Sequence, residues 1–524
     1  MKLKKASYVW AIKHLLKEGD TDLFPVPFEF QLIKACWNEL LPRLETLEIQ
    51  DYKWKTGRSM IIPKDKLGFR KATQLDPLDS LILTAIIYEL GKKIEKHRSP
   101  IEDQNVFSYR FKPSGARFYR GDITWHDFWR VSMERAKSGK TKFVVVTDIA
   151  DFYNQIYHHP LEHQLSSALP EHAKKALMQF VAKTTHGVSR GIPIGPHAVH
   201  ILAEAALISI DSSIDSSGYS YCRYVDDMHF FATTKEEAEL IIYKLVDILD
   251  TQQKLIPQKH KTKILSVEEF IEIANQNLKD RPLDNSEEQI LGVINRNSNN
   301  DPYAKVEIKK ISSTDLKSLS EANISALVEK YLAEEDINYI RFGWLLRRLT
   351  QVGTPGAIDT LLKNMHKLTP VLGEVCRYII NSASNYTGDP KSLGAKIWSN
   401  LDNPIIHQSQ YLTLLLLDIY AKLPEINHLS KVTMDYSQFP GTRQRKIILA
   451  AISGKKSAWL KERKNDFDNA DPWVRRAILK SIPQFPGDEG QHWLKYAKKH
   501  IDNLEKIVLE GTIERDFGVS KITF

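Results

Sequence analysis

The chain has 524 residues, of which 42% are hydrophobic and 26% charged, and its formal net charge is +8. This length exceeds what one compact core accommodates, so two or more domains are expected. The composition is typical of soluble proteins, no apolar run is long enough to span a membrane, and the three scattered cysteines form neither a disulfide framework nor a zinc cluster. We therefore expect a cytoplasmic protein without membrane partners, whose basic excess permits nucleic-acid binding.

The N-terminal part combines predicted helices with a basic hairpin. Residues 1 to about 50 are expected to be helical segments separated by a loop. Residues 60–70 have the pattern of a β-hairpin that carries Lys64, Lys66 and Arg70. One interpretation is a solvated strand pair. The other is a set of cations that hold a triphosphate, because Arg and Lys are the usual phosphate partners.

A helix and an aromatic loop come next. Asp76 and Pro77 form a helix start, and apolar periodicity continues to Leu90. Between 99 and 121 aromatic and basic residues alternate, as in Tyr109-Arg110-Phe111. Base stacking combined with phosphate contact explains this alternation, and so does packing of aromatic rings against arginines.

A predicted hairpin in the middle of the chain carries two adjacent carboxylates at its tip. Aromatic and β-branched residues favour strands at 219–223 and 228–232, with Asp226 and Asp227 at the turn between them. Another strand, at 142–147, ends in Asp148. An isolated Asp-Asp pair is usually an ordinary turn. A third carboxylate at a strand end makes a divalent-cation site the stronger interpretation, because clustered carboxylates repel each other unless a cation neutralises them.

Further segments complete this half of the chain. A glycine- and proline-rich stretch at 190–196 indicates close backbone approach, and a helix is predicted after it from His197 to about Ile210. An amphipathic helix is expected at 235–251, followed by a loop and a strand within 255–264. The polar stretch 295–302 is a predicted linker.

The remainder of the chain is predicted to be helical. From about residue 315, helical segments recur at a spacing near 40 residues, as in helix-pair solenoids, and Pro472 begins a segment similar to a HEAT-type helix. Its basic residues, Arg475 and Arg476 among them, indicate either a solvated helix face or a surface that holds an oligomer or guides a product strand.

Three carboxylates on two strand ends suit two-metal phosphoryl transfer. In that chemistry two Mg²⁺ ions about 3.5–4 Å apart activate an attacking hydroxyl and stabilise the leaving pyrophosphate. Asp148, Asp226 and Asp227 supply the hard oxygen ligands that Mg²⁺ prefers, and Mn²⁺ is an alternative ion.

These motifs resemble the blocks of the reverse transcriptase palm. Tyr224-Val225-Asp226-Asp227 is similar to the third block and Asp148-Ile149-Ala150-Asp151-Phe152-Tyr153 to the first. Gly191-Ile192-Pro193-Ile194-Gly195-Pro196 is similar to the second block, although Ile194 replaces the usual Gln. Gln258-x-x-Lys261-Thr262 is similar to the fourth, with Gln258 where Asn is usual. The resemblance covers about residues 50 to 270.

The resemblance implies roles for individual residues. Asp148 and Asp226 would bridge both metals, with Asp227 as an auxiliary ligand and the Ile149 carbonyl completing one shell. Lys261 would lie near the pyrophosphate as a general acid. Tyr153 would block the sugar 2′-hydroxyl and so favour dNTPs. The remaining dNTP-binding residues would be Lys64, Lys66, Arg70, Gly191, Pro193 and Gly195.

Within that superfamily the chain most resembles the abortive-infection reverse transcriptases, of the AbiK kind and their prophage-borne relatives. The likeness rests on Asp-x-x-x-Phe-Tyr in the first block, on Arg223-Tyr224 before the aspartate pair, and on the helical C-terminal part. It implies phage defence, homo-oligomers, and untemplated synthesis of single-stranded DNA that is primed by, and covalently attached to, a tyrosine. Tyr8 is our candidate primer, because it lies near the N-terminus behind Lys2, Lys4 and Lys5. The alternative for Tyr8 is a place in the packed core of the first helix.

The expected architecture is an α+β reverse transcriptase fingers–palm domain at 1–300, with fingers to about 140 and palm to about 300, then an all-α HEAT-like domain at 301–524. Three other functions compete with untemplated synthesis. A template-copying polymerase of a retron-like defence element would keep the same motifs. A catalytically idle scaffold, whose helical domain binds a protein or RNA partner, would have no reason to retain three clustered carboxylates. A two-metal nuclease would have no use for the glycine–proline block.

Overall fold

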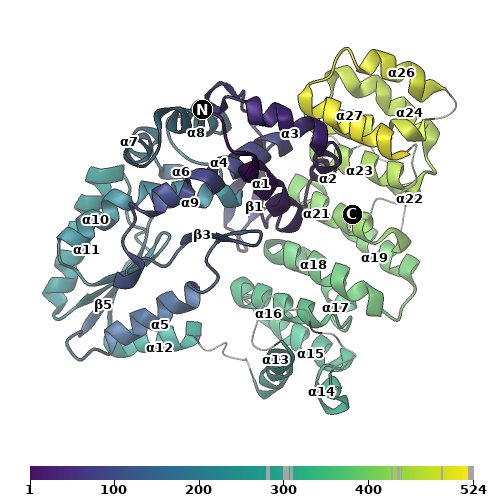
Figure 1. Ribbon diagram of the computed structural model, residues 1–524. Coiled ribbons are helices and arrows are strands. Elements are labelled where there is room, and N and C mark those ends of the chain that lie inside the picture. The colour runs from purple at the N-terminus through teal and green to yellow at the C-terminus, as the bar shows by residue number, and fades with distance from the viewer. Residues whose placement is uncertain are drawn as a thin grey trace. The chain divides into compact units, whose positions relative to one another are not determined.

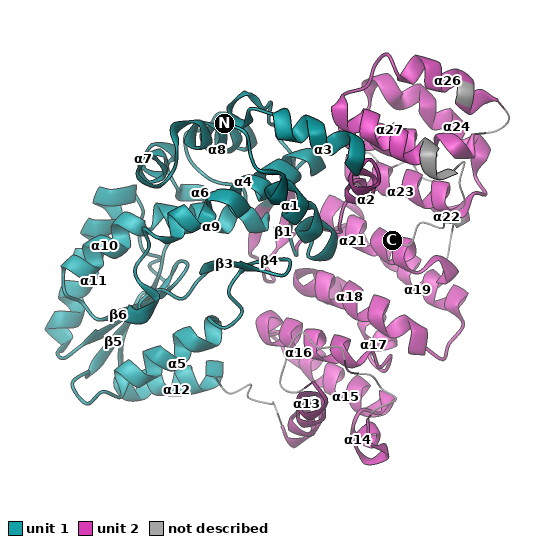
Figure 2. Cartoon of the chain, viewed as in Figure 1, with its two compact units in different colours: residues 1–22, 37–59, 72–281 teal, residues 23–36, 60–71, 282–524 magenta. Residues whose placement is uncertain are grey.

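The computed structural model describes residues 1–278, 284–298, 306, 311–426, 429–433, 437, 439–485 and 488–516. The chain forms two compact units (Figures 1 and 2). The first comprises Met1–Asp22, Trp37–Ser59 and Ala72–Arg281, and the second Leu23–Cys36, Met60–Lys71 and Pro282–Phe524.

A four-stranded sheet is the centre of the first unit. Its strands, in spatial order, are β6 (Tyr221–Tyr224), β7 (Asp227–Ala232), β5 (Phe143–Asp148) and β8 (Lys263–Ser266), and every neighbouring pair is antiparallel. The predicted strand before Asp148 and the predicted hairpin around Asp226 are confirmed. Their β-branched and aromatic residues suit a sheet that is covered on both faces.

Helices cover both faces of this sheet. On one face lie α5 (Trp125–Ala136) and α12 (Val267–Leu278), whose Phe128 and Phe270 pack with Val144 and Phe231 of the strands. On the other lies α11 (Lys235–Gln253), as Figure 1 shows. Each large apolar side chain buried in this way contributes about 1.5–3 kcal/mol, so the sheet and the residues at its ends are firmly held.

Two other predicted helices of the first unit are present, but their lengths differ from the prediction. The predicted helix capped by Asp76 is α4 (Pro77–Glu95), and the Asp76 carboxylate accepts the Leu78 N–H at 3.3 Å. The helix predicted at 197–210 is broken at Leu207. It divides into a short 3₁₀ turn, α9 (His200–Ala206) and α10 (Ile208–Ser216).

Further elements of the first unit surround this framework. They are α1 (Lys5–Lys17), α3 (Trp37–Thr46), α6 (Phe152–Gln155), α7 (His158–Ala168), α8 (Glu171–Thr184), β3 (Phe111–Ser114) and β4 (Arg117–Tyr119). The strands β3 and β4 form a hairpin within the loop predicted at 99–121. The predicted basic hairpin is β1 (Arg58–Pro63) with β2 (Phe69–Gln74). Residues 60–71 at its tip cluster with the second unit.

Apart from the hairpin tip at residues 60–71, the described regular structure of the second unit is helical. Its helices are α2 (Glu29–Ala35), α13 (Asn285–Asn297), α14 (Ser313–Ser318), α15 (Glu321–Ala333), α16 (Tyr339–Val352), α17 (Ile358–Lys363), α18 (Leu372–Ser382), α19 (Pro390–Leu401), α20 (Pro404–His407), α21 (Gln410–Lys422), α22 (Leu429–Val432), α23 (Pro440–Ser453), α24 (Ser457–Arg463), α25 (Pro472–Ser481), α26 (Glu489–Ala497) and α27 (Asn503–Asp516). None of the described helices of the chain combines the length and the apolar character needed to cross a bilayer.

The division between the units differs from the predicted one. It falls at residue 281 rather than 300, and the segment 23–36 joins the second unit. Within that unit Glu29 of α2 forms a buried ion pair with Arg476 of α25 at 2.8 Å. Such long-range pairing leaves no local sequence signal. The predicted linker at 295–302 begins inside α13, and its residues 299–302 lie outside the described part of the chain.

Candidate active site

The three predicted carboxylates meet at one end of the sheet. Asp148 ends β5 and is paired in register with Asp227, the first residue of β7. Tyr224 and Asp227 close the β6–β7 hairpin, so Val225 and Asp226 form its two-residue turn. The Ile149 N–H donates to the Asp226 carbonyl at 3.1 Å, which ties the two strand ends together. The sequence prediction of Asp148, Asp226 and Asp227 as neighbours is therefore confirmed.

Lys261 reaches this cluster from the segment before β8. The Gln258 N–H donates to the Asp148 carbonyl at 2.6 Å, and this contact returns the chain to the strand end. The Lys261 ammonium donates to Asp148 Oδ2. Partial burial opposes the charge of Lys261, but the hydrogen bond and charge of Asp148, with the charges of Asp227 and Asp226, outweigh it and raise its pKa. Lys261 is therefore a cation beside the carboxylates.

Burial and neighbouring charges both act on the Asp226 carboxyl. Burial, followed by the neighbouring Asp148 and Asp227, raises the pKa of Asp226 to about 7. Asp148 is only 6% exposed, and its Oδ1 atom is buried without a hydrogen-bond partner among the described residues. Buried carboxylate oxygens in this state are destabilising unless a cation joins them.

The donor set fits Mg²⁺ or Mn²⁺ chemically, although the side chains are not gathered into a ready metal-binding group. No cluster of three His, Cys, Asp or Glu in the described residues has metal-binding geometry. In this arrangement Lys261 neutralises Asp148 instead. The buried Asp148 Oδ1 and the high pKa of Asp226 mark two oxygens that a hard cation would satisfy. The bridge between Ile149 and Pro257 is closed by the flanking bonds from the Gln258 N–H to Asp148 and from the Ala150 N–H to Ile256, and the ligand role of the Ile149 carbonyl stays a prediction.

A buried polar network that the sequence did not reveal holds the catalytic turn. Val225 has φ 56°, which is strained for a β-branched residue and needs support from its surroundings. Its N–H donates to Ser108 Oγ at 2.9 Å, and its carbonyl accepts from Arg223 Nη1 at 2.9 Å. Both sides of the strained residue are thereby fixed.

Two acidic residues anchor that network. Arg223 is 0% exposed and makes a bidentate ion pair with Asp211, at 2.7 and 2.5 Å. Glu204 accepts from Ser108, from Arg223 at 3.1 Å and from Arg98 at 2.6 Å. Although burial opposes ionisation, Arg223 and Arg98 lower the pKa of Glu204. The network joins a loop, α9 and α10 to the turn, and only the position of Arg223 next to Tyr224 could have suggested it.

Tyr153 lies in an aromatic cluster within electrostatic reach of Asp226. Its hydroxyl shares a hydrogen bond of 2.7 Å with His200 Nδ1, and the His200 ring stacks on Tyr109 with centroids 4.0 Å apart. Burial raises the pKa of Tyr153, and Asp226 is among the charges that raise it further. Burial also lowers the pKa of His200 to about 3, so this imidazole is neutral. The ring of Tyr153 is held in place, as a sugar-selecting side chain requires, and that role stays a prediction.

The glycine–proline block packs against the first block. Gly191 and Gly195 have φ 89° and 129°, a backbone region that favours glycine. The Ile192 N–H donates to the Tyr153 carbonyl at 2.9 Å, and the Gly191 N–H donates to the Ile156 carbonyl at 2.7 Å. Pro193 is buried between these glycines. The predicted set Gly191, Pro193 and Gly195 thus shapes the backbone beside Tyr153.

The predicted triphosphate cations lie on a different element. Lys64 and Lys66 are exposed and Arg70 is half-buried, all within the tip of the β1–β2 hairpin. That tip clusters with the second unit, whereas the carboxylates belong to the first. The triphosphate role of these three residues stays a prediction.

The structure argues against Tyr8 as a primer. Tyr8 lies within α1, which packs on α4, and its side chain is 0% exposed. Burial, with a contribution from the charge of Glu89, raises the pKa of its hydroxyl well above the ordinary value. The structure therefore favours the alternative interpretation, in which Tyr8 is a core residue of the first helix. A position near the N-terminus does not by itself make a side chain accessible.

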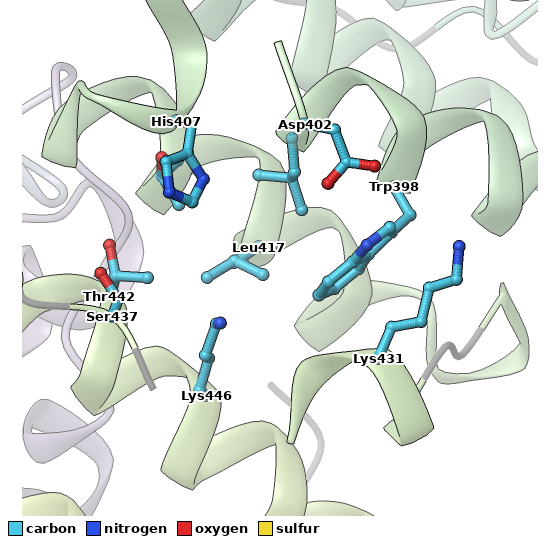
Figure 3. A pocket seen from close by; sticks show the side chains of 10 residues that line it. Trp398, Asp402, His407, Leu417, Lys431, Ser437, Thr442 and Lys446 are labelled. Carbon is cyan, nitrogen blue, oxygen red and sulfur yellow. The ribbon is translucent and has the colours of Figure 1, made fainter. Parts of the chain in front are cut away.

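The second unit contains a cavity of about 270 Å³ between α19–α20 and α21–α23. Figure 3 shows Trp398, Leu417 and Lys446 around a common space, with Asp402 and His407 on the same wall region. None of these residues belongs to a motif that the sequence indicated.

One segment of the chain matches a known protein family. Residues 80–295, which include all three aspartates and Lys261, match the family described as reverse transcriptase (RNA-dependent DNA polymerase). No protein with a curated description matches the chain by sequence. Among solved structures, apo telomerase from Candida tropicalis is 12% identical, with a TM-score of 0.33 over 72% of this chain and 74% of that one. Telomerase from Candida albicans in complex with a fragment of telomeric RNA is 12% identical, with a TM-score of 0.31 over 75% of this chain and 63% of that one. Likeness at this level carries no inference about function.

The chain carries a reverse transcriptase domain. The protein is a nucleotidyltransferase, a DNA polymerase of the reverse transcriptase type.

Proposed function

We propose that the protein adds deoxynucleotides to a growing DNA strand at the end of the β5–β7 sheet. The observation that carries this proposal is the register pairing of Asp148 with Asp227 beside Asp226, with Lys261 on Asp148. Reverse transcriptase domains use nucleotide substrates and divalent metals, in most cases Mg²⁺. Two such ions, when bound, would activate the attacking hydroxyl and neutralise charge on the phosphates.

The chain's own residues divide the remaining work. Asp148, Asp226 and Asp227 would hold the metals, with the Ile149 carbonyl as a further ligand. Lys261, a cation in this structure, would donate a proton to the leaving pyrophosphate. Tyr153, fixed by His200, would exclude the 2′-hydroxyl of ribonucleotides.

A narrower proposal rests on the resemblance to abortive-infection reverse transcriptases. It holds that synthesis is untemplated, starts from a tyrosine of the protein, leaves single-stranded DNA attached to it, and serves phage defence in a homo-oligomer. The replacement of the usual Gln by Ile194 supports it, because Ile cannot donate or accept hydrogen bonds at a template base. The primer would be a tyrosine other than Tyr8.

The test is incorporation by the purified full chain with Mg²⁺ or Mn²⁺ and single dNTPs, with and without an added template–primer, and with Asp226→Asn as the control. We expect DNA synthesis by the wild type in both arms and none by the variant. Synthesis only with a template would replace the narrower proposal by the retron-like alternative. No synthesis in either arm would remove the polymerase proposal. Mass spectrometry of the DNA-linked peptide after nuclease digestion then identifies the primer residue.

A further inference from the structure

Another cavity lies in the first unit, and basic side chains are the most frequent kind in its lining. It has a volume of about 530 Å³ and lies between the C-terminal end of α4, the loop after it and strand β3. Two glutamates line it together with five basic residues, Lys92, Lys96, Arg98, Arg110 and Lys112. Lysines near a helix C-terminus also complement the helix dipole, so the lysines alone would not define a site.

Arg110 is the feature that distinguishes this cavity from a solvated basic surface. It is only 3% exposed. Its Nη2 donates to the Ser99 carbonyl at 2.8 Å, and its Nε lies 2.9 Å from Glu95 Oε1. Its Nη1 is buried without a hydrogen-bond partner among the described residues. An unmet buried donor costs about 1–3 kcal/mol, more when it is charged, so a ligand that accepts from it is favoured.

The charge of Arg110 is only partly compensated. Glu95 is its ion-pair partner, but Glu95 also accepts from Arg98 at 2.8 Å and from the Phe111 N–H at 3.1 Å. Burial, followed by repulsion from Arg98, lowers the pKa of Arg110 to about 10. Arg110, Glu95, Arg98 and Glu204 form a series of buried ion pairs. Arg110 is the end of this series that lines the cavity.

We propose that this cavity binds a phosphate group. A rotation of the Arg110 side chain would bring Nη1, which is closed from solvent in this structure, to the anion, and Lys92, Lys96 and Lys112 would surround that anion. A guanidinium with neighbouring ammonium groups matches the charge and the several acceptor oxygens of a phosphate. That chemistry is shared by the backbone of a polynucleotide strand and by a free phosphate, and the experiment separates the two.

The experiment measures binding by the full chain in EDTA, so that catalysis and the proposed metal site play no part. One probe is a fluorescein-labelled 20-nucleotide oligothymidylate, followed by anisotropy, and the other is inorganic phosphate, followed by calorimetry. The test variant is Lys92→Gln/Lys96→Gln/Lys112→Gln. The matched control is Lys93→Gln/Lys137→Gln/Lys140→Gln, which removes the same charge from exposed lysines outside the cavity.

We expect the test variant to bind the oligonucleotide at least tenfold more weakly, while the control stays within about twofold of the wild type. The salt slope of log K should become shallower by about 2, since each phosphate contact on a single strand contributes about 0.7. Loss of inorganic phosphate binding alone would assign the cavity to free phosphates. Equal affinities of test and control variants for both probes would overturn the proposal.

Discussion

Arg223 in the first unit and Arg476 in the second are both 0% exposed and both ion-paired. Arg476 pairs with Glu29 and lies over the Trp473 ring, and these two contacts involve side chains of α2 and α25. Arg223 pairs with Asp211 and also donates to the backbone of the catalytic turn at Val225. Buried ion pairs of similar kind therefore serve packing in one region and the placement of carboxylates in the other. Substitutions in the two regions should separate stability from rate.

The largest effect is expected at the carboxylates themselves. Asp226→Asn removes one metal-binding charge while it keeps the shape of the side chain. A bound metal contributes several kcal/mol to the transition state, and each 1.4 kcal/mol is about tenfold in rate, so incorporation should fall about a thousandfold or more. Steady-state incorporation and circular dichroism measure the rate and the fold. A folded variant with wild-type rate would remove Asp226 from the site.

In the helical unit we expect a loss of stability without a loss of rate. Arg476→Met leaves Glu29 buried without its cation, which typically costs about 3–5 kcal/mol. Denaturant unfolding should show this decrease, whereas incorporation per folded molecule should match the wild type. The sequence placed Arg476 either on a solvated helix face or on a surface that holds an oligomer or guides a product strand. Its burial contradicts both interpretations. If Arg476→Met changed the incorporation rate and left the free energy of unfolding unchanged, Arg476 would serve catalysis rather than packing.

Sugar selection tests the aromatic cluster next to the carboxylates. Tyr153→Ala removes the ring that His200 holds, and the ratio of ribonucleotide to deoxynucleotide incorporation should rise about tenfold to hundredfold, as pocket discrimination by shape allows. Competition between one NTP and its dNTP measures the ratio. Tyr157→Ala, a neighbouring tyrosine outside the cluster, is the control. If the ratio stays unchanged in Tyr153→Ala, another residue selects the sugar.

A smaller effect on the incorporation rate is expected at Ser108, where the buried polar network contacts the turn at Val225. Ser108→Ala leaves the Val225 N–H without its acceptor, at a cost of about 1–3 kcal/mol that falls on the placement of Asp226. The maximal rate should drop about tenfold while the apparent dNTP affinity and the sugar ratio stay constant. Ser132→Ala, another buried serine of the same unit, controls for loss of a buried hydroxyl. Equal rates in the two variants would show that the network does not position the turn.

The sequence predicted those parts of the site whose signals are local. The strand before Asp148 and the hairpin around Asp226 have the residue types of buried strands, and Gly191 and Gly195 mark the backbone that glycine alone readily adopts. The rest depends on distant partners. Ser108 meets Val225 across 117 positions, and Glu29 meets Arg476 across 447. Hydrophobic periodicity does not indicate contacts between residues that are distant in sequence. The burial of Tyr8 depends on such a contact, between α1 and α4, and so could not be predicted from the sequence.

The central claim is that Asp148, Asp226 and Asp227 bind divalent metal together, and Mn²⁺ binding as a function of pH tests it most directly. Without metal, the raised pKa of about 7 means that folded Asp226 keeps its proton where the unfolded chain has lost it. This group therefore lowers stability as pH rises from about 4 to about 7, and metal binding must displace the proton. Electron paramagnetic resonance should show Mn²⁺ affinity of the wild type rising between about pH 6 and 7.5, and weak, pH-independent binding by Asp226→Asn. Equal affinity and equal pH dependence in the two proteins would contradict the account.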